Sequence, residues 1–487
     1  MQKLPETLYS AAQVRELDRI AIEEFKIPGY KLMCRAGKAV FEGITRKWPE
    51  TRSLTVWCGS GNNAGDGYII ARLALQAGLD ALAVCVGDPE KLEGDALTAF
   101  RDYTQTGGRA EPFHSGQMIE TDLLIDALLG TGLDRPVTGL YAEAIEAINR
   151  AGVPVVAVDI PSGLNADTGN AMGCAVKADC TVSFIGLKRG LFTGQAAEYV
   201  GEIIYDALEV PDDVFKQIQA GVFRVQQKPL ASRNRCAHKG NMGHVLVVGG
   251  DLGFSGAVRM AGEAALRVGA GLVSIATRSE HAGLMNLNRP ELMCHGVESE
   301  ADLVGLLDKA NVVALGPGLG QKEWGKTMFG AVLKSGKPVV LDADGLNLLA
   351  LSPTNKPNWI LTPHPGEAGR LLHNSTQSVQ QDRFAAVSAI QAAYGSIAVL
   401  KGAGTLIASD SRIAVSTTGN PGMASGGMGD VLSGVIAGLI AQGLDMQEAA
   451  EQGVFLHGCA ADLGAAKDGE RGLLATDLLP FLRQLVN

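Results

Sequence analysis

Short apolar runs alternate with amphipathic segments along the first half of the chain. The runs are rich in β-branched residues, and the segments between them place apolar side chains at helical spacing. This alternation predicts a parallel sheet covered by helices on both faces, which is typical of a Rossmann-like three-layer domain. Ser10 and Gln13 have capping-box spacing and predict where the first helix begins. The predicted strands are SLTVWC (53–58), DALAVCVG (80–87), DLLIDALLG (122–130), VPVVAVDIPSG (153–163) and GEIIYDALEV (201–210).

The alternation lapses between about residues 211 and 240 and then restarts. This lapse, with two prolines and a run of basic and amide side chains, predicts a linker region at 216–238. The chain is therefore expected to form two α/β domains, residues 1–215 and 239–487. The strands expected in the second domain are GHVLVVGG, GLVSIAT, NVVALGPG, KPVVLDADG, NWILTPHPGE, SIAVLKGAG and TLIASDSRIAV.

Composition narrows the class of protein further. The 487 residues are 46% hydrophobic and carry a net charge of −10 with no basic stripe, which argues against nucleic-acid binding. The most apolar helical candidate, VLSGVIAGLIAQGL, is too short and glycine-rich to span a membrane. The N-terminus shows no signal-peptide pattern, and the eight cysteines, none in a C-x-x-C motif, indicate reduced thiols. A soluble, cytoplasmic protein is predicted.

The turn after the first long strand, GSGNNAGDG (59–67), matches a dinucleotide fingerprint in Gly59, Gly61 and Ala64. However, Asp66 would set a negative charge where a pyrophosphate meets the helix N-terminus. The match therefore argues for a nucleotide-related ligand but against hydride transfer.

Polar clusters follow three predicted strands of the first domain, at 61–67, 126–136 and 159–164. Carboxyl ends of parallel strands meet at one edge of a sheet, where ligands bind. Their carboxylate, amide and hydroxyl oxygens suit a hard cation, and no histidine or cysteine pair suggests zinc. The alternative is structural: Asp66 caps a helix and Asp159 begins a turn.

The segments GSGNNAGDGY, IDALLGTGL and VAVDIPSGL, preceded by IPGYKLMCRAG, resemble the NAD(P)H-hydrate epimerase family across nearly the whole first domain. That family interconverts the R and S forms of NADHX and NADPHX, cofactors hydrated on the nicotinamide ring, and uses K⁺. The resemblance implies that Asn63, Asp126 and Ser162 bind K⁺ and that Asp159 is catalytic. The residues it implies in contact with the hydrate are Asn62, Asn63, Ala64, Gly65, Asp66, Gly130, Thr131, Gly132, Leu133, Asp134, Arg135, Pro136 and Asp159.

The second domain carries a longer glycine motif, TGNPGMASGGMGDVLSGVIAGLI (418–440). Stacked glycines before a helix expose N–H groups to an anion, which the helix dipole also favours. Asp430, at the end of this loop, is suited to take a proton from a hydroxyl that attacks a phosphoryl group. The alternative is a glycine turn in which Asp430 only caps the helix.

Other strand ends of this domain carry supporting groups. GPGLG (316–320) is suited to an anion, and His364 lies between two prolines that fix its direction. Lys401 begins a glycine turn suited to a nucleotide. Asp342 and Asp344 are candidate magnesium ligands or turn caps, while Ser255, Gly256 and Ala257 begin a helix.

These motifs together resemble NAD(P)H-hydrate dehydratase, which has a ribokinase-like α/β fold, over essentially the whole second domain. The resemblance implies that a nucleotide phosphate is spent to expel water from the S hydrate. Members fused to an epimerase domain use ADP and give AMP and phosphate; we also expect Mg²⁺. Asp430 would be catalytic. Ala257, Gly318, His364 and Asp430 would contact the hydrate, and Lys401, Gly402, Ala403, Gly404, Thr405 and Gly429 would bind the nucleotide.

Two other functions are compatible with the same patterns. The second domain could be a small-molecule kinase of the same fold, which would accumulate a stable phosphoester instead of free phosphate. The first domain could be a nucleotide-binding sensor or scaffold without turnover. The partners expected are the hydrates and ADP, with no nucleic acid or membrane, and the chain is expected to form a homo-oligomer.

Overall fold

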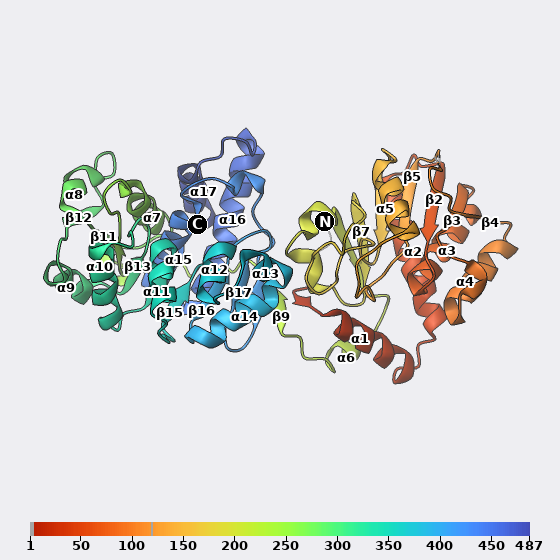
Figure 1. The fold of residues 1–487 in the computed structure, drawn as a ribbon, viewed down its shortest axis with the longest axis horizontal. Coiled ribbons are helices and arrows are strands. Elements are labelled where there is room, and N and C mark those ends of the chain that lie inside the picture. The colour runs from red at the N-terminus through yellow and green to blue at the C-terminus, as the bar shows by residue number, and fades with distance from the viewer. Residues whose placement is uncertain (1–3, 118–119) are drawn as a thin grey trace. The chain divides into compact units, whose positions relative to one another are not determined.

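The computed structural model of the protein describes residues 4–117 and 120–487. Its contacts divide the chain after Val222 into two compact units, the second comprising Phe223–Asn487. Figure 1 traces the first unit in red to yellow-green and the second in green to blue. Both units are α/β, as predicted. Among the described residues, no helix is long and apolar enough to cross a membrane.

The first unit contains a seven-stranded sheet in the order β4-β3-β2-β5-β6-β7-β8, and its neighbouring strands pair in parallel. Side chains of β2 alternate between two cores: Val56 packs with α2, α3 and α4, and Trp57 packs with α5 on the opposite face. This is the predicted three-layer arrangement. The strands are β2 (Ser53–Cys58), β3 (Asp80–Cys85), β4 (Arg109–Pro112), β5 (Leu123–Ala127), β6 (Val155–Val158), β7 (Cys180–Phe184) and β8 (Glu202–Asp206).

Helix starts in this unit follow local sequence signals. Ser10 caps α1 through the predicted capping box, because its hydroxyl accepts from Gln13 N–H and the Gln13 side chain accepts from Ser10 N–H. The glycine turn 59–61 leads directly into α3. The helices are α1 (Ala11–Glu23), α2 (Gly29–Lys47), α3 (Asn62–Gln76), α4 (Gly94–Gln105), α5 (Leu140–Arg150) and α6 (Asp212–Phe215).

The second unit has a mixed sheet, in the order β9-β18-β17-β16-β15-β14-β13-β10-β11-β12. Strands β10 to β16 pair in parallel, whereas β17 pairs antiparallel with β16 and with β18. The strands are β9 (Val222–Arg224), β10 (His244–Val248), β11 (Leu272–Thr277), β12 (Met293–Gly296), β13 (Val312–Leu315), β14 (Val339–Leu341), β15 (Trp359–Leu361), β16 (Ile397–Leu400), β17 (Leu406–Ala408) and β18 (Ile413–Val415). β9 falls within the stretch proposed as a linker.

One face of this sheet is covered by α7, α15 and α16, whose apolar side chains share a core with Val245 and Val247 of β10. The helices of this unit are α7 (Ser255–Arg267), α8 (Ser279–Met285), α9 (Glu300–Lys309), α10 (Glu323–Lys334), α11 (Ala343–Leu351), α12 (Pro365–Leu371), α13 (Thr376–Gln381), α14 (Arg383–Tyr394), α15 (Met428–Ala441), α16 (Met446–Asp468) and α17 (Leu478–Leu485).

Helix α15 lies unusually close to α7. A Cβ added at Gly434 would lie 2.0 Å from the Ala261 carbonyl oxygen, and one at Gly438 would lie 2.5 Å from Val268. Glycine at these positions therefore lets the two backbones approach, and this approach holds the N-terminus of α15 above the sheet.

We expect Gly434→Ala to destabilise the second unit by about 1–3 kcal/mol, since the added methyl meets a backbone carbonyl that cannot rotate away. Differential scanning calorimetry of the full chain should show a downward shift of one transition only. Gly330→Ala is the matched control, because this helical glycine of α10 faces open space within 4 Å. A Gly434→Ala protein as stable as the control would contradict the packing argument.

Candidate active sites

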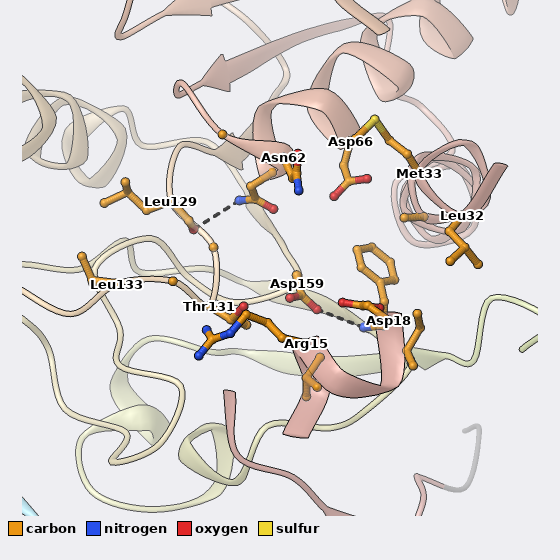
Figure 2. Close-up of a pocket in the computed structure, with 18 of the residues that line it drawn as sticks. Arg15, Asp18, Leu32, Met33, Asn62, Asp66, Leu129, Thr131, Leu133 and Asp159 are labelled. Carbon is orange, nitrogen blue, oxygen red and sulfur yellow. Dashed lines mark hydrogen bonds between the residues drawn. The ribbon is translucent and has the colours of Figure 1, made fainter. Parts of the chain in front are cut away.

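In the first unit the winding of the sheet reverses between β2 and β5, and the loops that follow these strands part there. A cavity of about 620 Å³ opens at this point (Figure 2). The two loops approach closely at Gly59, because a Cβ there would lie 2.0 Å from the Leu128 carbonyl oxygen. Loops 60–63 and 128–135 and the helices α1 and α2 contribute lining residues.

Most of the residues predicted to contact a ligand line this cavity. Ala64 and Gly65 do not, because they face inward, where Ala64 is buried and Gly65 packs on Met33 of α2. Pro136 is also absent from the described residues that line the cavity. Those that line the cavity are Asn62, Asn63, Asp66, Gly130, Thr131, Gly132, Leu133, Asp134, Arg135 and Asp159.

The three residues predicted to bind a cation lie close together: Asn63 lines the cavity, and Asp126 and Ser162 are fully buried. Ser162 donates from its backbone N–H (2.7 Å) and its hydroxyl (2.5 Å) to the two carboxylate oxygens of Asp126. The Leu129 carbonyl oxygen lies 3.1 Å from Ser162 Oγ and accepts from the Asn63 amide at 3.2 Å. Burial raises the pKa of Asp126 to about 6, although hydrogen bonds from Ser162 oppose the shift. Carboxylate, hydroxyl, amide and carbonyl oxygens form a donor set that fits a hard monovalent cation.

Asp159 lies at the carboxyl end of β6 in the left-handed backbone region, at φ 68°. Its Oδ1 accepts the Phe184 N–H at 3.1 Å and pairs with the ammonium of Lys188, a side chain that is completely buried. Figure 2 shows the Asp159 carboxylate directed into the cavity. A strained backbone beside a ligand cavity is typical of a functional residue.

Two more carboxyl groups enter the same cavity without hydrogen-bond partners among the described residues. Asp18 comes from α1 and Asp66 from the second turn of α3 (Figure 2). Burial, with the Asp159 charge adding to it, raises the pKa of Asp18 to about 6 against the opposing effect of Lys188. Burial and the charges of Asp159 and Asp18 raise the pKa of Asp66 well above its ordinary range. The cavity therefore combines one paired carboxylate with two unpaired carboxyl groups whose pKa values are raised.

In the second unit the winding reverses between β10 and β13. Here Gly249 takes the role of Gly59, since a Cβ at this position would lie 2.1 Å from the Pro317 carbonyl oxygen. Gly318, at φ 58°, packs against Phe254 and Ala257 at the start of α7. The structure thus brings the two predicted contacts Ala257 and Gly318 together, beside a Phe254 side chain that is 62% exposed.

Lys401 lies among three acids at the carboxyl edge of this sheet. Its ammonium lies 2.7 Å from Asp342 Oδ1 and 3.9 Å from Glu367 Oε2. Although burial opposes ionisation, the Lys401 charge holds the pKa of Asp342 below its ordinary value. Asp430, in the first turn of α15, has its pKa raised to about 7 by burial and by the Asp342 charge. Asp430 is therefore suited to exchange a proton near neutral pH.

The remaining predicted acids and histidine have identifiable partners. Asp344 accepts the Gly320 N–H at 2.9 Å and so fixes the GPGLG loop. His364 occupies the N-cap of α12, where its Nδ1 accepts the Gly366 N–H at 3.0 Å. Its Nε2 lies 3.3 Å from Glu367, and burial together with the Lys401 charge lowers the pKa of His364. The imidazole is thereby kept neutral at the rim of the site.

The glycine turn that begins at Lys401 is held from below by Arg383, whose side chain is 1% exposed. The guanidinium donates to the carbonyl oxygens of Leu400, Lys401 and Gly404. Gly402 (φ 135°) and Gly404 (φ 63°) have backbone conformations that other residues rarely adopt. Ala403 and Thr405 belong to the same turn. Gly429, in the first turn of α15, faces the lysine that begins it, since a Cβ added at Gly429 would lie 3.2 Å from Lys401 Nζ.

Four side chains of these sites were not predicted from the sequence. They are Asp18, Lys188, Glu367 and Arg383. Lys188 follows β7, a strand with the polar residues Thr181 and Ser183 that interrupt the apolar pattern. Recognition of that strand would have placed Lys188 near the carboxyl edge. Asp18 and Arg383 lie on helices, where no local signal separates them from surface charges.

Comparison with known proteins finds relatives that match this chain over nearly its whole length. The family model described as YjeF-related protein N-terminus matches residues 29–190, and the NAD(P)H-hydrate dehydratase model matches residues 245–483. The bifunctional NAD(P)H-hydrate repair enzyme Nnr of Coxiella burnetii is 50% identical over 485 residues, which cover 99% of both chains. The enzyme of the same name from Escherichia coli is 42% identical over 492 residues, covering 99% of this chain and 95% of the other.

Solved structures are similar to about half of this chain. The ADP/ATP-dependent NAD(P)H-hydrate dehydratase of Bacillus subtilis, co-crystallised with ATP and Mg²⁺, is 31% identical, covering 53% of this chain and 93% of that one, with a TM-score of 0.48. A ribokinase-like superfamily protein from Enterococcus faecalis is 31% identical over 52% of this chain and 90% of its own, with a TM-score of 0.49.

The raised pKa of Asp430 gives a testable stability effect. Folding raises this pKa from its ordinary value near 4 to about 7, so the contribution of Asp430 to stability is present below pH 4 and is lost as the pH rises to 7. Asp430→Asn should leave stability nearly unchanged at pH 4 and stabilise the second unit by up to about 4 kcal/mol at pH 8. Melting curves at the two pH values, without ligand, measure this difference. The exposed-acid control Asp410→Asn should shift both curves equally; the same behaviour in Asp430→Asn would refute the burial argument.

Proposed function

The chain belongs to the bifunctional NAD(P)H-hydrate repair enzymes, and from this premise we propose which of its residues carry out the two reactions. The protein is an NAD(P)H-hydrate epimerase and an ADP-dependent NAD(P)H-hydrate dehydratase. A sensor function for the first unit and a phosphoester-forming kinase function for the second are therefore set aside.

We assign epimerisation to the cavity of the first unit. The carrying observation is the Asp159 carboxylate, held in a strained backbone conformation against a buried ammonium and directed into the cavity. Loops 60–63 and 130–135 would bind the remainder of the hydrate. Asp159 would move a proton at the hydroxyl of the hydrated carbon, whose stereochemistry the reaction inverts.

The cluster of Asn63, Asp126 and Ser162 would hold K⁺. Its oxygen donors fit the ion, and a positive charge there would offset the cost of burying the Asp126 carboxylate. When bound, the ion would supply a fixed positive charge beneath the 128–130 loop. The protein residues would then orient that loop toward the hydrate through Leu129.

We assign dehydration to the carboxyl edge of the second sheet. Asp430 would accept the proton of the substrate hydroxyl as that oxygen attacks the β-phosphorus of ADP. The bond to the AMP oxygen breaks, and the phosphorylated oxygen later leaves as phosphate as the ring nitrogen lone pair forms a C=N bond. Loss of a proton from the adjacent ring carbon then forms the C=C bond of the restored nicotinamide ring and returns the electrons to nitrogen. Lys401 and the 402–405 turn would bind the nucleotide. Ala257, Gly318 and His364 would bind the hydrate.

Mg²⁺ would accompany the nucleotide in this site. The described residues include no group of three or more His, Cys, Asp or Glu side chains arranged to hold a metal ion. Asp342 is already paired with Lys401, and Asp344 fixes a loop. We therefore propose that Mg²⁺ binds chiefly through phosphate oxygens. A homo-oligomeric assembly, expected from the sequence, is likewise part of the proposal.

The two assignments predict reciprocal losses. Asp430→Asn should lower ADP-dependent dehydration by about 10²-fold or more and leave epimerisation at the wild-type rate. Asp159→Asn, chosen because asparagine tolerates a positive φ, should do the opposite. Chromatographic separation of the R and S hydrates over time, with absorbance at 340 nm for restored NADH, measures both rates. Either variant losing both activities while folded, or neither, would refute the assignment of two independent sites.

Potassium should affect the first unit specifically. An ion bound only by the folded state raises its stability in proportion to saturation. We expect the melting temperature of the first unit and the epimerisation rate to be higher in KCl than in NaCl or tetramethylammonium chloride at equal ionic strength. Asp126→Asn should abolish the difference. An identical melting temperature and rate in all three salts would exclude the site.

A further inference from the structure

The buried ammonium of Lys188 has no exposed side-chain surface. It pairs with Asp159 and lies 3.2 Å from both Ser183 Oγ and the Phe184 carbonyl oxygen. These three acceptors match the three hydrogens of an ammonium group. Because no donor remains for a ligand, the role of Lys188 is directed at Asp159 and not at the substrate.

The Asp159 carboxylate is fixed by the same end of β7. The Phe184 N–H donates to Oδ1 at 3.1 Å, and Ser183 Oγ lies 3.4 Å from the same atom. The other oxygen, Oδ2, has no partner among the described residues. A carboxylate with one oxygen anchored and one free is suited to accept a proton from a water molecule in the cavity.

Asp66 and Asp18 lack such anchors. Neither carboxyl group has a hydrogen-bond or ion-pair partner in the described part of the chain, and both line the cavity that Asp159 enters. Figure 2 shows Asp66 directed into the cavity from α3, whereas Asp159 follows β6 and Asp18 lies on α1. The other charged residues that line the cavity are Arg15, Asp95, Asp134 and Arg135. Lys188 is thus the one buried cation described there, and it is already paired.

We propose that Asp66 is the proton donor of the epimerisation, Asp159 the proton acceptor, and Lys188 the positioning residue that assigns these two roles. The proposal rests on the assignment of epimerisation to this cavity. Three carboxyl groups surround one buried ammonium, and only Asp159 is bonded to it, which assigns the acceptor role to Asp159 and leaves the donor role to a carboxyl group without that partner. Asp18 adds negative charge beside Asp66 and so favours its protonated form, in agreement with the raised pKa of both groups.

The chemical step balances with water alone. Asp66 transfers its proton to the hydroxyl of the hydrated carbon, the C–O bond breaks, and the ring nitrogen lone pair forms a C=N bond as water leaves. A second water attacks the other face, a new C–O bond forms, and the C=N electrons return to nitrogen. The proton released by that water passes to Asp159. Exchange with solvent then restores the starting protonation of Asp66 and Asp159, and the reverse reaction uses the same groups in exchanged roles.

The test measures log(kcat/KM) for epimerisation against pH in full-length variants, with dehydration of the S hydrate as an internal measure of integrity. Asp66→Asn should slow epimerisation by about 10²-fold or more, because an amide cannot donate a proton of this acidity. Lys188→Met should move the acidic limb of the profile to higher pH by about one unit or more, and Lys188→Arg should restore it. Glu16→Gln, an exposed change on α1, is the control with unchanged rate and profile.

Asp18→Asn tests the same idea without disturbing the buried ion pair. Removing its negative charge should make Asp66 ionise more easily, so the alkaline limb should move to lower pH. The proposal is overturned if Asp66→Asn epimerises within about threefold of wild type, or if Lys188→Met and Asp18→Asn both leave the limbs in place. If instead the wild type lacks epimerisation while dehydrating the S hydrate, the assignment of epimerisation to the first unit fails, and not merely the division of roles.

Discussion

Burying several carboxyl groups around a single ammonium is the constraint on which both sites depend. In the first unit, Asp18, Asp66 and Asp159 share Lys188; in the second, Asp342, Glu367 and Asp430 share Lys401. One cation stabilises one carboxylate well. The cost of burying the remaining acids appears as an increase in their pKa values. That cost is what gives Asp66 and Asp430 proton affinities that an exposed aspartate lacks. The same imbalance destabilises the ligand-free fold progressively as the pH rises from about 4 to about 7, which is a common consequence of building an active site.

The backbone has the same feature beside both clusters, a close glycine contact between two loops. Each sheet reverses its winding once, and at each reversal a glycine lets the two parting loops touch: Gly59 against Leu128, and Gly249 against Pro317. A side chain at either position would separate the strand ends by the width of a methyl group or more. Of the clustered acids, Asp66 lies on α3, the helix that follows the first of these loops, so its position depends directly on a contact that contains no charged group. Gly434 of α15 acts likewise by setting how closely Asp430 approaches the sheet.

Much of this arrangement could be predicted from the sequence, because strong local signals mark it. Parallel strands of apolar residues are recognisable, and their ends carry the glycine and aspartate motifs; Asn63, Asp126 and Ser162 lie far apart in sequence yet meet as expected. The ion pairs could not be predicted. β7 mixes polar with apolar residues, so the lysine after it had no assigned strand, and Asp18 has the spacing of an ordinary surface residue on α1. Pairing across 29 residues between Asp159 and Lys188 is a property of tertiary packing alone.

Placing the two reactions in separate units has a kinetic consequence that needs no particular arrangement between them. Epimerisation inverts one carbon without an external energy source, so by itself it only brings the R and S hydrates to equilibrium. Dehydration consumes ADP and is driven in one direction by cleavage of its phosphate bond. Each S molecule removed draws another from the R pool at a rate set by the slower site. The first site therefore needs groups beside Lys188 that transfer protons in both directions. Asp430, by contrast, has to accept a proton in one direction only. The reversible site needs both a proton donor and a proton acceptor, and the committed site needs a single base with a pKa near neutrality.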